Sequence, residues 1–528
     1  MKLHTKHIFA LVGILALGLT AARAQTDGAL LDALVQKGVL SDQEAEDIRA
    51  SSIKEYSQTG ASKLTLSNHI TNLKLYGDAR YRFEYLDEKP QNSLLGQSSG
   101  SPAVALGNHA TTTNRSRYRV RFGADYTFTD DFSAGIELES GTAADSSNQT
   151  IGNGYGKFGI NVGLLYLQWK PTEWATLTGG KQRNPIYTTD LVWDPDINPE
   201  GGTEVLSWTI PIDFDDDAPS ASSSSDPKAL APARSSGPSD YSLTVGITGG
   251  QFIYADNNEN AGTPLNGTGV ADKTDVWQFV EQIPVQFNFD KDTFIKEAPG
   301  FSVLTGGGNS NSGAGGWTNS SITFVGPHAA DHLKIVTAPG EIDWKFENIP
   351  FKVYWDFALN LEGKARIQDV YLGEHNGLTT PGAATTTLNA GNLSAQRQNQ
   401  GLGDNIAWVA GLQVGQNKKK GDWSIKGDFR QVGLGSIDPN TNDSDWGDSF
   451  LNQQGVKVQG IYNFTDFLTG SLTYINSWDL KTSLFDGTNG QSTSQLPLVT
   501  QASSTGAVAG LNGVKSTERI EADIIWKF

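Results

Sequence analysis

Four oxygen-bearing side chains spaced two residues apart are the strongest candidates for chemistry in this sequence. They are Asp194, Asp196, Asn198 and Glu200, in the stretch LVWDPDINPEGG (residues 191–202). Ligands at the first, third, fifth and seventh positions are typical of a calcium-binding loop. However, the sixth position is Pro199 instead of glycine, and the twelfth is Val205 instead of glutamate. An EF-hand is therefore excluded, and a looser calcium site is only a weak alternative.

Catalytic patterns are missing elsewhere in the chain. Beyond residue 24 the histidines are His69, His109, His328, His332 and His375. None lies in a metalloprotease pattern, and no glycine-rich phosphate loop ends in Lys-Ser or Lys-Thr. Residues 96–100 (GQSSG) have the letters of a nucleophile elbow but not its strand-to-helix context. His328 and His332 lie beside Pro327, which favours a loop over a metal-binding helix. We predict a protein that is not an enzyme, with no cofactor and no metal.

The N-terminus has the features of an export signal. A basic start with Lys2 and Lys6 precedes an apolar core (IFALVGILALGL) and the small-residue motif Ala22-Arg23-Ala24. We predict a cleaved signal peptide over residues 1–24. The remaining chain has 37 basic and 58 acidic residues, a formal charge of −21, which makes nucleic acid an unfavourable partner. The chain has no cysteine, so an exported fold must be stable without disulfides.

From about residue 72 the sequence alternates with period two. In LKLYGDARYRFEY (residues 73–85), apolar residues such as Leu75 and Phe83 share one face, and charged residues such as Arg80 and Arg82 share the other. The same split recurs in RSRYRVRFGADYTF, FKVYWDFALNLEG and WSIKGDFRQV. Many segments reach ten residues, the length that crosses a bilayer at a tilt. No stretch after the signal is long and apolar enough for a spanning helix.

The connections alternate between tight turns and long polar loops, as in bacterial outer-membrane barrels. We predict that the long, solvated connections include residues 142–157, 184–202 and 435–453. Aromatic residues recur at the tight turns, which predicts an interfacial girdle. They are Phe128, Phe132, Trp169, Trp174, Phe346, Phe351, Phe464 and Phe467. We predict a closed antiparallel transmembrane β-barrel of about sixteen strands over residues 72–528, with fourteen or eighteen as alternatives.

The two ends of the mature chain add to this prediction. Residues 25–71 contain a short helical stripe and a capping-box pattern from Ser41 to Glu44, which predicts a small periplasmic helical segment and linker. The final segment ERIEADIIWKF alternates and ends on an aromatic residue. It resembles the C-terminal signal by which outer-membrane barrels are recognised for assembly, with Ile524, Trp526 and Phe528 as its apolar positions.

These segments together resemble the bacterial putative porin family. The resemblance rests on the signal peptide, the segment LLDALVQKGVLSDQEAEDI, the first strand LKLYGDARYRFEY and the piece GGKQRNPIYTTDLVWDPDINPEGG. It implies an outer-membrane diffusion channel in a Gram-negative envelope. It also implies a homotrimer and leaves the solute undefined.

The charged faces then become candidate pore walls, since a barrel of this size has a water-filled interior. Opposed basic and acidic walls would orient dipolar solutes. We predict as pore-lining Lys74, Asp78, Arg80, Arg82, Glu84, Arg117, Arg119, Arg121, Glu137, Glu139, Lys181 and Arg183. The alternative is that the arginine ladder forms only structural salt bridges. The arginines favour anions locally and the net charge favours cations, so the sign of selectivity stays open.

The stretch LVWDPDINPEGG (residues 191–202) follows the fifth predicted strand. Prolines 185, 195 and 199 would stiffen it, and porins of this type fold a loop into the lumen from this position. We predict a constriction loop in which Asp194, Asp196 and Glu200 face Arg80, Arg117 and Arg119.

The function predicted from sequence is passive diffusion of small hydrophilic solutes and ions. The expected partners are outer-membrane lipid, the barrel assembly machinery, the solutes and copies of the same chain. One alternative is a substrate-selective channel for anions such as phosphate, or for sugars. Another is a structural or adhesive barrel that tethers the envelope.

Overall fold

The chain divides into two compact units, residues 1–68 and residues 69–528. The computed structural model describes residues 34–37, 39–48, 69–90, 111–152, 154–212, 241–255, 275–305, 332–366, 405–449, 451–480, 501–502, 508–509 and 514–528. The predicted signal peptide, residues 96–100 and His328 lie outside these residues. In the first unit a helix covers residues 42–48, and Ser41 and Glu44 form the predicted capping box. In the described part of the chain, no helix has the length and apolar character needed to cross a membrane.

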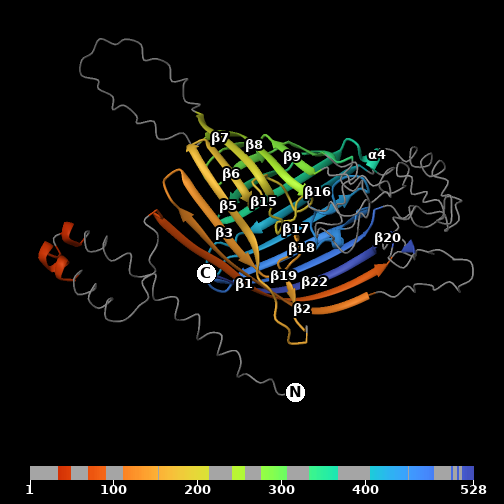
Figure 1. The fold of residues 1–528 in the computed structure, drawn as a ribbon, viewed down its shortest axis with the longest axis horizontal. Helices are drawn as coiled ribbons and strands as arrows, with labels where there is room; N and C mark the ends of the chain where they lie inside the picture. Colours follow the sequence, from red (N-terminus) through yellow and green to blue (C-terminus); the bar gives the residue numbers. More distant parts are fainter. Residues whose placement is uncertain are drawn as a thin grey trace, which may run out of the picture. The chain divides into compact units, whose positions relative to one another are not determined.

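The second unit is a closed antiparallel β-barrel. Its sheet closes because β1, the first strand, pairs with both β2 and the last strand, β22. Figure 1 shows β1 and β22 side by side in the wall. In chain order the wall consists of β1 (Asn72–Pro90), β2 (Thr111–Thr127), β3 (Phe132–Glu139), β5 (Asn161–Thr172), β6 (Ala175–Lys181), β7 (Glu200–Ile212), β8 (Tyr241–Ala255), β9 (Val276–Gln282) with β10 (Val285–Asn288), β11 (Phe294–Glu297) with β12 (Gly300–Thr305), β13 (Lys334–Thr337) with β14 (Gly340–Phe346), β15 (Ile349–Asn360), β16 (Ile406–Gly415), β17 (Trp423–Val432), β18 (Gln453–Asn463), β19 (Leu468–Asp479) and β22 (Val514–Lys527). Counting each joined pair once, the described residues form sixteen wall strands, as predicted.

Three adjacent wall strands are interrupted by proline at matching positions. Pro284 separates β9 from β10, Pro299 separates β11 from β12, and Pro339 separates β13 from β14. Proline has no N–H to donate to a ladder, so each ring breaks the regular pairing. The carbonyls still take part: Ile283 N donates to Pro299 O over 2.9 Å, and Ala298 N donates to Pro339 O over 2.9 Å. We define these three interruptions as the proline crease.

Alternation separates an apolar outer face from a charged inner face. In β1, Tyr81 and Phe83 are exposed on the outside, while the alternating residues Arg82 and Glu84 are buried on the inside. Their partners on β22, Ile524 and Ala522, continue the outer face. The predicted division of faces is therefore confirmed, and the exposed apolar belt is what a lipid-facing barrel wall requires.

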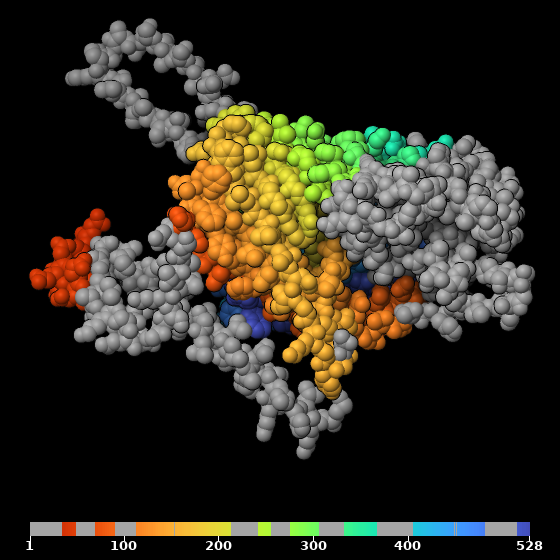
Figure 2. Space-filling view, viewed as in Figure 1, coloured from red at the N-terminus to blue at the C-terminus, as the bar shows by residue number. Residues whose placement is uncertain are grey.

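Aromatic pairs cluster on the outer wall near the tight turns. The rings of Phe132 and Trp169 stack at 5.8 Å between centroids, and those of Trp174 and Trp208 at 5.5 Å. Figure 2 shows the strands that carry these rings, in orange to yellow, as one continuous packed surface. At the chain end, Phe528 exchanges two backbone hydrogen bonds with Gly77 and stacks on Phe122. The terminal aromatic is thus built into the seam where the barrel closes.

Candidate functional site

The segment between β6 and β7, residues 182–199, crosses the barrel interior and touches several walls. Backbone and side-chain groups of Tyr187 and Gln282 hydrogen-bond each other over 2.7 and 2.9 Å. Thr189 Oγ1 donates to Asp356 Oδ2 of β15 over 2.8 Å. On the way back, Trp193 donates from its indole to Ile197 O and packs on Phe252 of β8. We define residues 182–199 as the first inner loop.

A second inner loop, residues 433–452 between β17 and β18, packs on the first. Asp194 N donates to Thr441 O over 2.6 Å, and Asp443 N donates to Asp190 O over 3.0 Å. The apolar residues Ile437 and Trp446 of this loop are buried. Residues 435–453 were predicted to be a solvated connection, and that prediction was wrong. Glycine, serine and aspartate are equally suited to bulk water and to a polar barrel interior, so composition did not separate the two.

The connection after β3 also turns inward. Ser140, Ser147 and Asn148 are buried, and Arg80 Nη2 donates to Asn148 Oδ1 over 2.6 Å. Ser444 of the second inner loop donates to Asp145 O over 3.3 Å. Residues 142–157 were also expected to be solvated, so within the described residues three connections, not one, converge inside the barrel.

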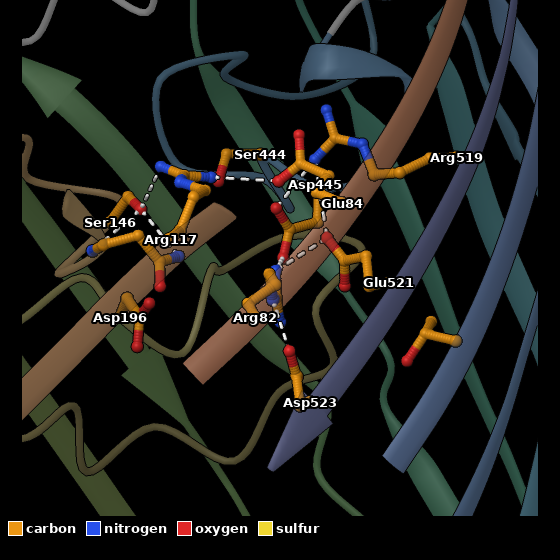
Figure 3. A network of polar contacts seen from close by, with 12 residues as sticks. Arg82, Glu84, Arg117, Ser146, Asp196, Ser444, Asp445, Arg519, Glu521 and Asp523 are labelled. Carbon is orange, nitrogen blue, oxygen red and sulfur yellow. Dashed lines mark hydrogen bonds and ion pairs between the residues drawn. The ribbon is translucent and has the colours of Figure 1, made fainter. Parts of the chain in front are cut away.

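A network of buried ion pairs anchors these loops to the wall where the barrel closes. Arg82 of β1 donates to Asp523 from two nitrogens, over 2.8 and 3.0 Å, and to Glu521 over 2.6 Å. Its Nη1 also contacts Asp445 of the second inner loop at 2.9 Å, and Asp445 takes a further contact of 2.7 Å from Arg519. Figure 3 shows Arg82 and Arg519 converging on Asp445 from neighbouring strands. These cations hold the pKa of Asp445 well below its ordinary value against the effect of burial.

The arginine ladder of β2 is paired along its length. Arg115 and Arg117 both contact Glu84, at 2.5 and 3.2 Å. Arg119 and Arg121 both contact Asp78, at 3.1 and 2.5 Å. The geometry favours the alternative that the sequence analysis left open, in which the ladder forms structural salt bridges. We define Arg82, Arg519, the four ladder arginines and their carboxylates as the arginine network.

A second ion cluster ties the first inner loop to the opposite wall. Asp190 lies between Arg430 Nη2 at 3.1 Å and Lys457 Nζ at 2.9 Å. Asp443 of the second inner loop shares both cations, at 3.5 and 2.6 Å. Arg430 also contacts Asp428 of its own strand at 2.9 Å. Because buried cations need compensation, this cluster fixes both loops against β17 and β18.

The three predicted loop carboxylates have different surroundings. Asp196 Oδ1 lies 3.8 Å from Arg119 Nη1 and 3.7 Å from Arg121 Nη1, so it faces the basic wall. Asp194 does not: its carboxylate accepts the N–H groups of Asp196 and Ser444, over 2.9 and 3.0 Å. Burial, together with the nearby Asp443 carboxylate, raises the pKa of Asp194 to about 8. Asp194 was therefore misplaced against Arg80 and Arg117.

Glu200 and Lys181 are on the opposite side of the wall from the expected one. Glu200 begins β7, pairs in register with Lys181 and accepts its ammonium at 2.8 Å. Lys181 is in register with Leu165, whose side chain is 59% exposed on the outer face. The alternation with period two predicted that Lys181 and Arg183 both face the interior, but β6 ends at Lys181. Only Arg183 turns inward, where it donates to Tyr76 Oη over 2.6 Å and contacts Glu137 at 3.4 Å.

The other predicted wall residues lie on the inner face in the order the alternation gives. Glu139 accepts a hydrogen bond from Ser147 over 2.8 Å, and Lys74 is exposed at the start of β1. In the described residues no group of three histidine, aspartate or glutamate side chains is arranged to hold a metal ion.

Beside the first inner loop, towards the tight-turn end, is a cavity of about 830 Å³. Residues of the barrel wall and of the first inner loop line this cavity, and it extends to Lys527 and Phe528 at the seam where the barrel closes. Its charged lining residues are Asp78, Arg121, Glu137, Glu139, Arg183, Asp190, Asp196, Glu341, Lys352, Lys426 and Lys527. Its aromatic lining residues are Tyr76, Tyr187, Trp193, Tyr354 and Phe528.

The tyrosines of this cavity were missed because they occupy inner positions among charged residues. Tyr76 covers Gly123 of β2, and Tyr354 covers Gly411 of β16, where an added Cβ would lie about 2.2 Å from each ring. Glycine on the neighbouring strand leaves the space for each ring to lie against the wall. An inner tyrosine in register with a glycine is the sequence signal that could have identified them. Lys352 and Lys426 were visible on charged faces but were not selected as site residues.

Comparisons with known proteins agree with the family expected from the sequence. Residues 65–302 match the model of the family described as putative porin. A search of curated protein sequences finds no match. Among solved structures, one described as Salmonella typhi OmpF in complex with daunomycin is similar at 10% identity, with a TM-score of 0.39, over 88% of this chain and 99% of that chain. The resemblance to the putative porin family is therefore confirmed over residues 65–302.

Proposed function

We propose that the protein is an outer-membrane porin that lets small hydrophilic solutes and ions diffuse through its barrel. The observation that carries the proposal is the division of the wall into two faces. The outer face is apolar and exposed, and the inner face is charged and surrounds a cavity of about 830 Å³. A structural barrel needs the apolar belt, and it could use the paired inner charges, but it has no need of a cavity lined by charged groups. The match to the putative porin family over residues 65–302 supports the same function.

The proposal places the chain in the outer membrane after export and cleavage of residues 1–24. Assembly would use the C-terminal signal Ile524, Trp526 and Phe528, and the mature protein would act as a homotrimer in outer-membrane lipid. The two inner loops would narrow the passage, with Asp196 opposite Arg119 and Arg121 as the charged constriction.

Conductance across a planar bilayer tests this function. Purified, folded protein should give stepwise ion-conducting events, and protein unfolded by heat before addition should give none. A folded barrel that produces no events would support the envelope-tethering alternative instead. Chemical cross-linking in native outer membranes would test the trimer separately.

A substrate-selective channel is the second candidate, and one observation favours it. Three connections fold into the barrel and are fixed there by buried ion pairs, so the open path is much narrower than the wall alone would allow. A narrow path with fixed side chains can discriminate between solutes, whereas a wide one cannot.

A further inference from the structure

The acidic side chains lining the cavity are already occupied. Asp78 contacts Arg119 and Arg121, and Glu341 contacts Lys352. The remaining acids follow the same rule: Asp190 with Arg430 and Lys457, Asp196 with Arg119 and Arg121, Glu137 with Arg183, and Glu139 as acceptor from Ser147. A cationic solute would therefore have to compete with arginine and lysine for every carboxylate except Glu139.

The cationic side chains that line the cavity do not all have a charged partner among the described residues. Arg121, Arg183 and Lys352 are paired, but within the described residues no carboxylate lies within ion-pair distance of Lys426 or Lys527. Lys527 is in register with Asp78, whose two oxygens are taken by Arg119 and Arg121. Lys426 is in register with Gln413 and Gln459, neither of which carries charge. The cavity therefore keeps two available ammonium groups.

Tyrosine rings are in contact with lysine ammonium groups at and beside the cavity. The Lys426 ammonium sits 4.6 Å from the ring centre of Tyr354, and the Lys296 ammonium sits 3.6 Å from that of Tyr187. The Tyr354 ring is fixed, because it lies on Gly411 and its hydroxyl donates to Asp428 over 2.8 Å. The fixed Tyr354 ring restricts the Lys426 ammonium that lies over it, so less side-chain freedom is lost when an anion binds to Lys426.

We propose that this cavity binds small organic anions with a flat apolar body, of the aromatic carboxylate class. The carboxylate would pair with Lys426, with Lys527 adding attraction from the closing seam, and the ring of the solute would lie against Tyr187, which is partly exposed and lines the cavity. The inference deepens the proposed channel function and rests on it, since it names the solute class that the channel favours. Phosphate would use the lysines without the rings, and a sugar would use the rings without the lysines.

Channel block with matched probes tests the proposal. Benzoate should reduce conductance at a lower concentration than benzamide, its neutral counterpart, and than inorganic phosphate or maltose. Lys426→Gln should raise the half-blocking concentration of benzoate about tenfold, the effect of losing about 1.4 kcal/mol of binding, and Lys426→Arg should restore most of it. Lys181→Gln is the matched control, because it removes a lysine from the outer face of the same barrel.

Several outcomes would overturn the proposal. Equal block by benzoate and benzamide would remove the role of charge, and an unchanged value for folded Lys426→Gln would remove the role of Lys426. Stronger block by phosphate or by maltose would assign the cavity to that class instead. If the wild type conducts no ions, the channel function fails, and calorimetric titration of benzoate into the detergent-solubilised protein still decides whether the site exists.

Discussion

The arginine network and the pair Lys426 and Lys527 contain the same kinds of charge in very different settings. Arg82 alone contacts three carboxylates, and its side chain is only 5% exposed. Lys426 contacts an aromatic ring and lines an open cavity. Buried charges need partners to be tolerated, whereas a charge beside water can remain available to a solute. In this barrel the number of carboxylate partners, rather than the presence of charge, separates structural from solute-binding positions.

Removal of Arg82 should produce the largest effect on the structural side of this comparison. Arg82→Ala removes a cation shared by Asp445, Glu521 and Asp523, and breaking such a buried set costs about 3–5 kcal/mol. We expect a marked fall in the temperature at which the folded barrel loses its heat-modifiable mobility on SDS gels. Lys345→Ala is the control, because Lys345 forms a half-exposed pair with Asp292 at 3.5 Å that is worth about 0–1 kcal/mol. Equal losses in the two variants would break the comparison.

Replacement of the first inner loop should change conductance most strongly. The ends of the loop are already joined, since Gln182 N donates to Pro199 O over 3.0 Å, so a short Gly-Ser linker can replace residues 185–197. We expect conductance to rise severalfold as the obstruction is removed. Asp190 is lost with the loop, but Lys457 and Arg430 keep Asp443 as a partner, at 2.6 and 3.5 Å, so neither cation is left unpaired. An unchanged conductance in a folded variant would mean that this loop does not limit flow.

Asp194 gives the contact between the two inner loops a pH dependence. Its folded-state pKa, about 8, is above the ordinary value of 3.8, so between these pH values the folded protein holds a proton that the unfolded chain has released. The free energy of unfolding should therefore fall as pH rises from about 4 to about 8, with a slope of at most about 1.4 kcal/mol per pH unit. Asp194→Asn keeps an acceptor for Ser444 and should reduce that slope in urea titrations at several pH values. The same slope in the wild type and in Asp194→Asn would contradict the assignment of this pH dependence to Asp194.

The smallest effect should come from Lys181. Its partner Glu200 is 60% exposed and both lie on the outer face, so Lys181→Gln should change stability by less than about 1 kcal/mol and leave ion selectivity unaltered. Reversal potentials across a salt gradient would measure this. A shift in selectivity would place Lys181 on the permeation path and contradict its position on the outer face.

The sequence predicts the barrel well because strand alternation is local. The faces of β1 and β2, their pairing at the closing seam and the sixteen wall strands all follow from period two and from the tight turns. Lys181 was misassigned at the point where that local rule ends, since β6 stops there and Arg183 turns independently.

The candidate site is less predictable because its contacts join distant parts of the chain. Asp190 and Lys457, or Arg82 and Asp445, are hundreds of residues apart, and nothing near either member indicates its partner. The inward path of the first inner loop was anticipated from its position and prolines. The second inner loop carried no comparable local signal.

The proline crease has a consequence for how the barrel selects its register. Along ordinary strands a slip of one residue leaves the backbone able to form new ladder bonds, even though it exchanges the two faces. At Pro284, Pro299 and Pro339 a slipped strand could not form all of these bonds. The slip would move a proline, which has no N–H, to a position where the neighbouring strand needs a donor. Three such positions on adjacent strands restrict the stagger of that wall during closure, and the stagger sets the width of the finished barrel.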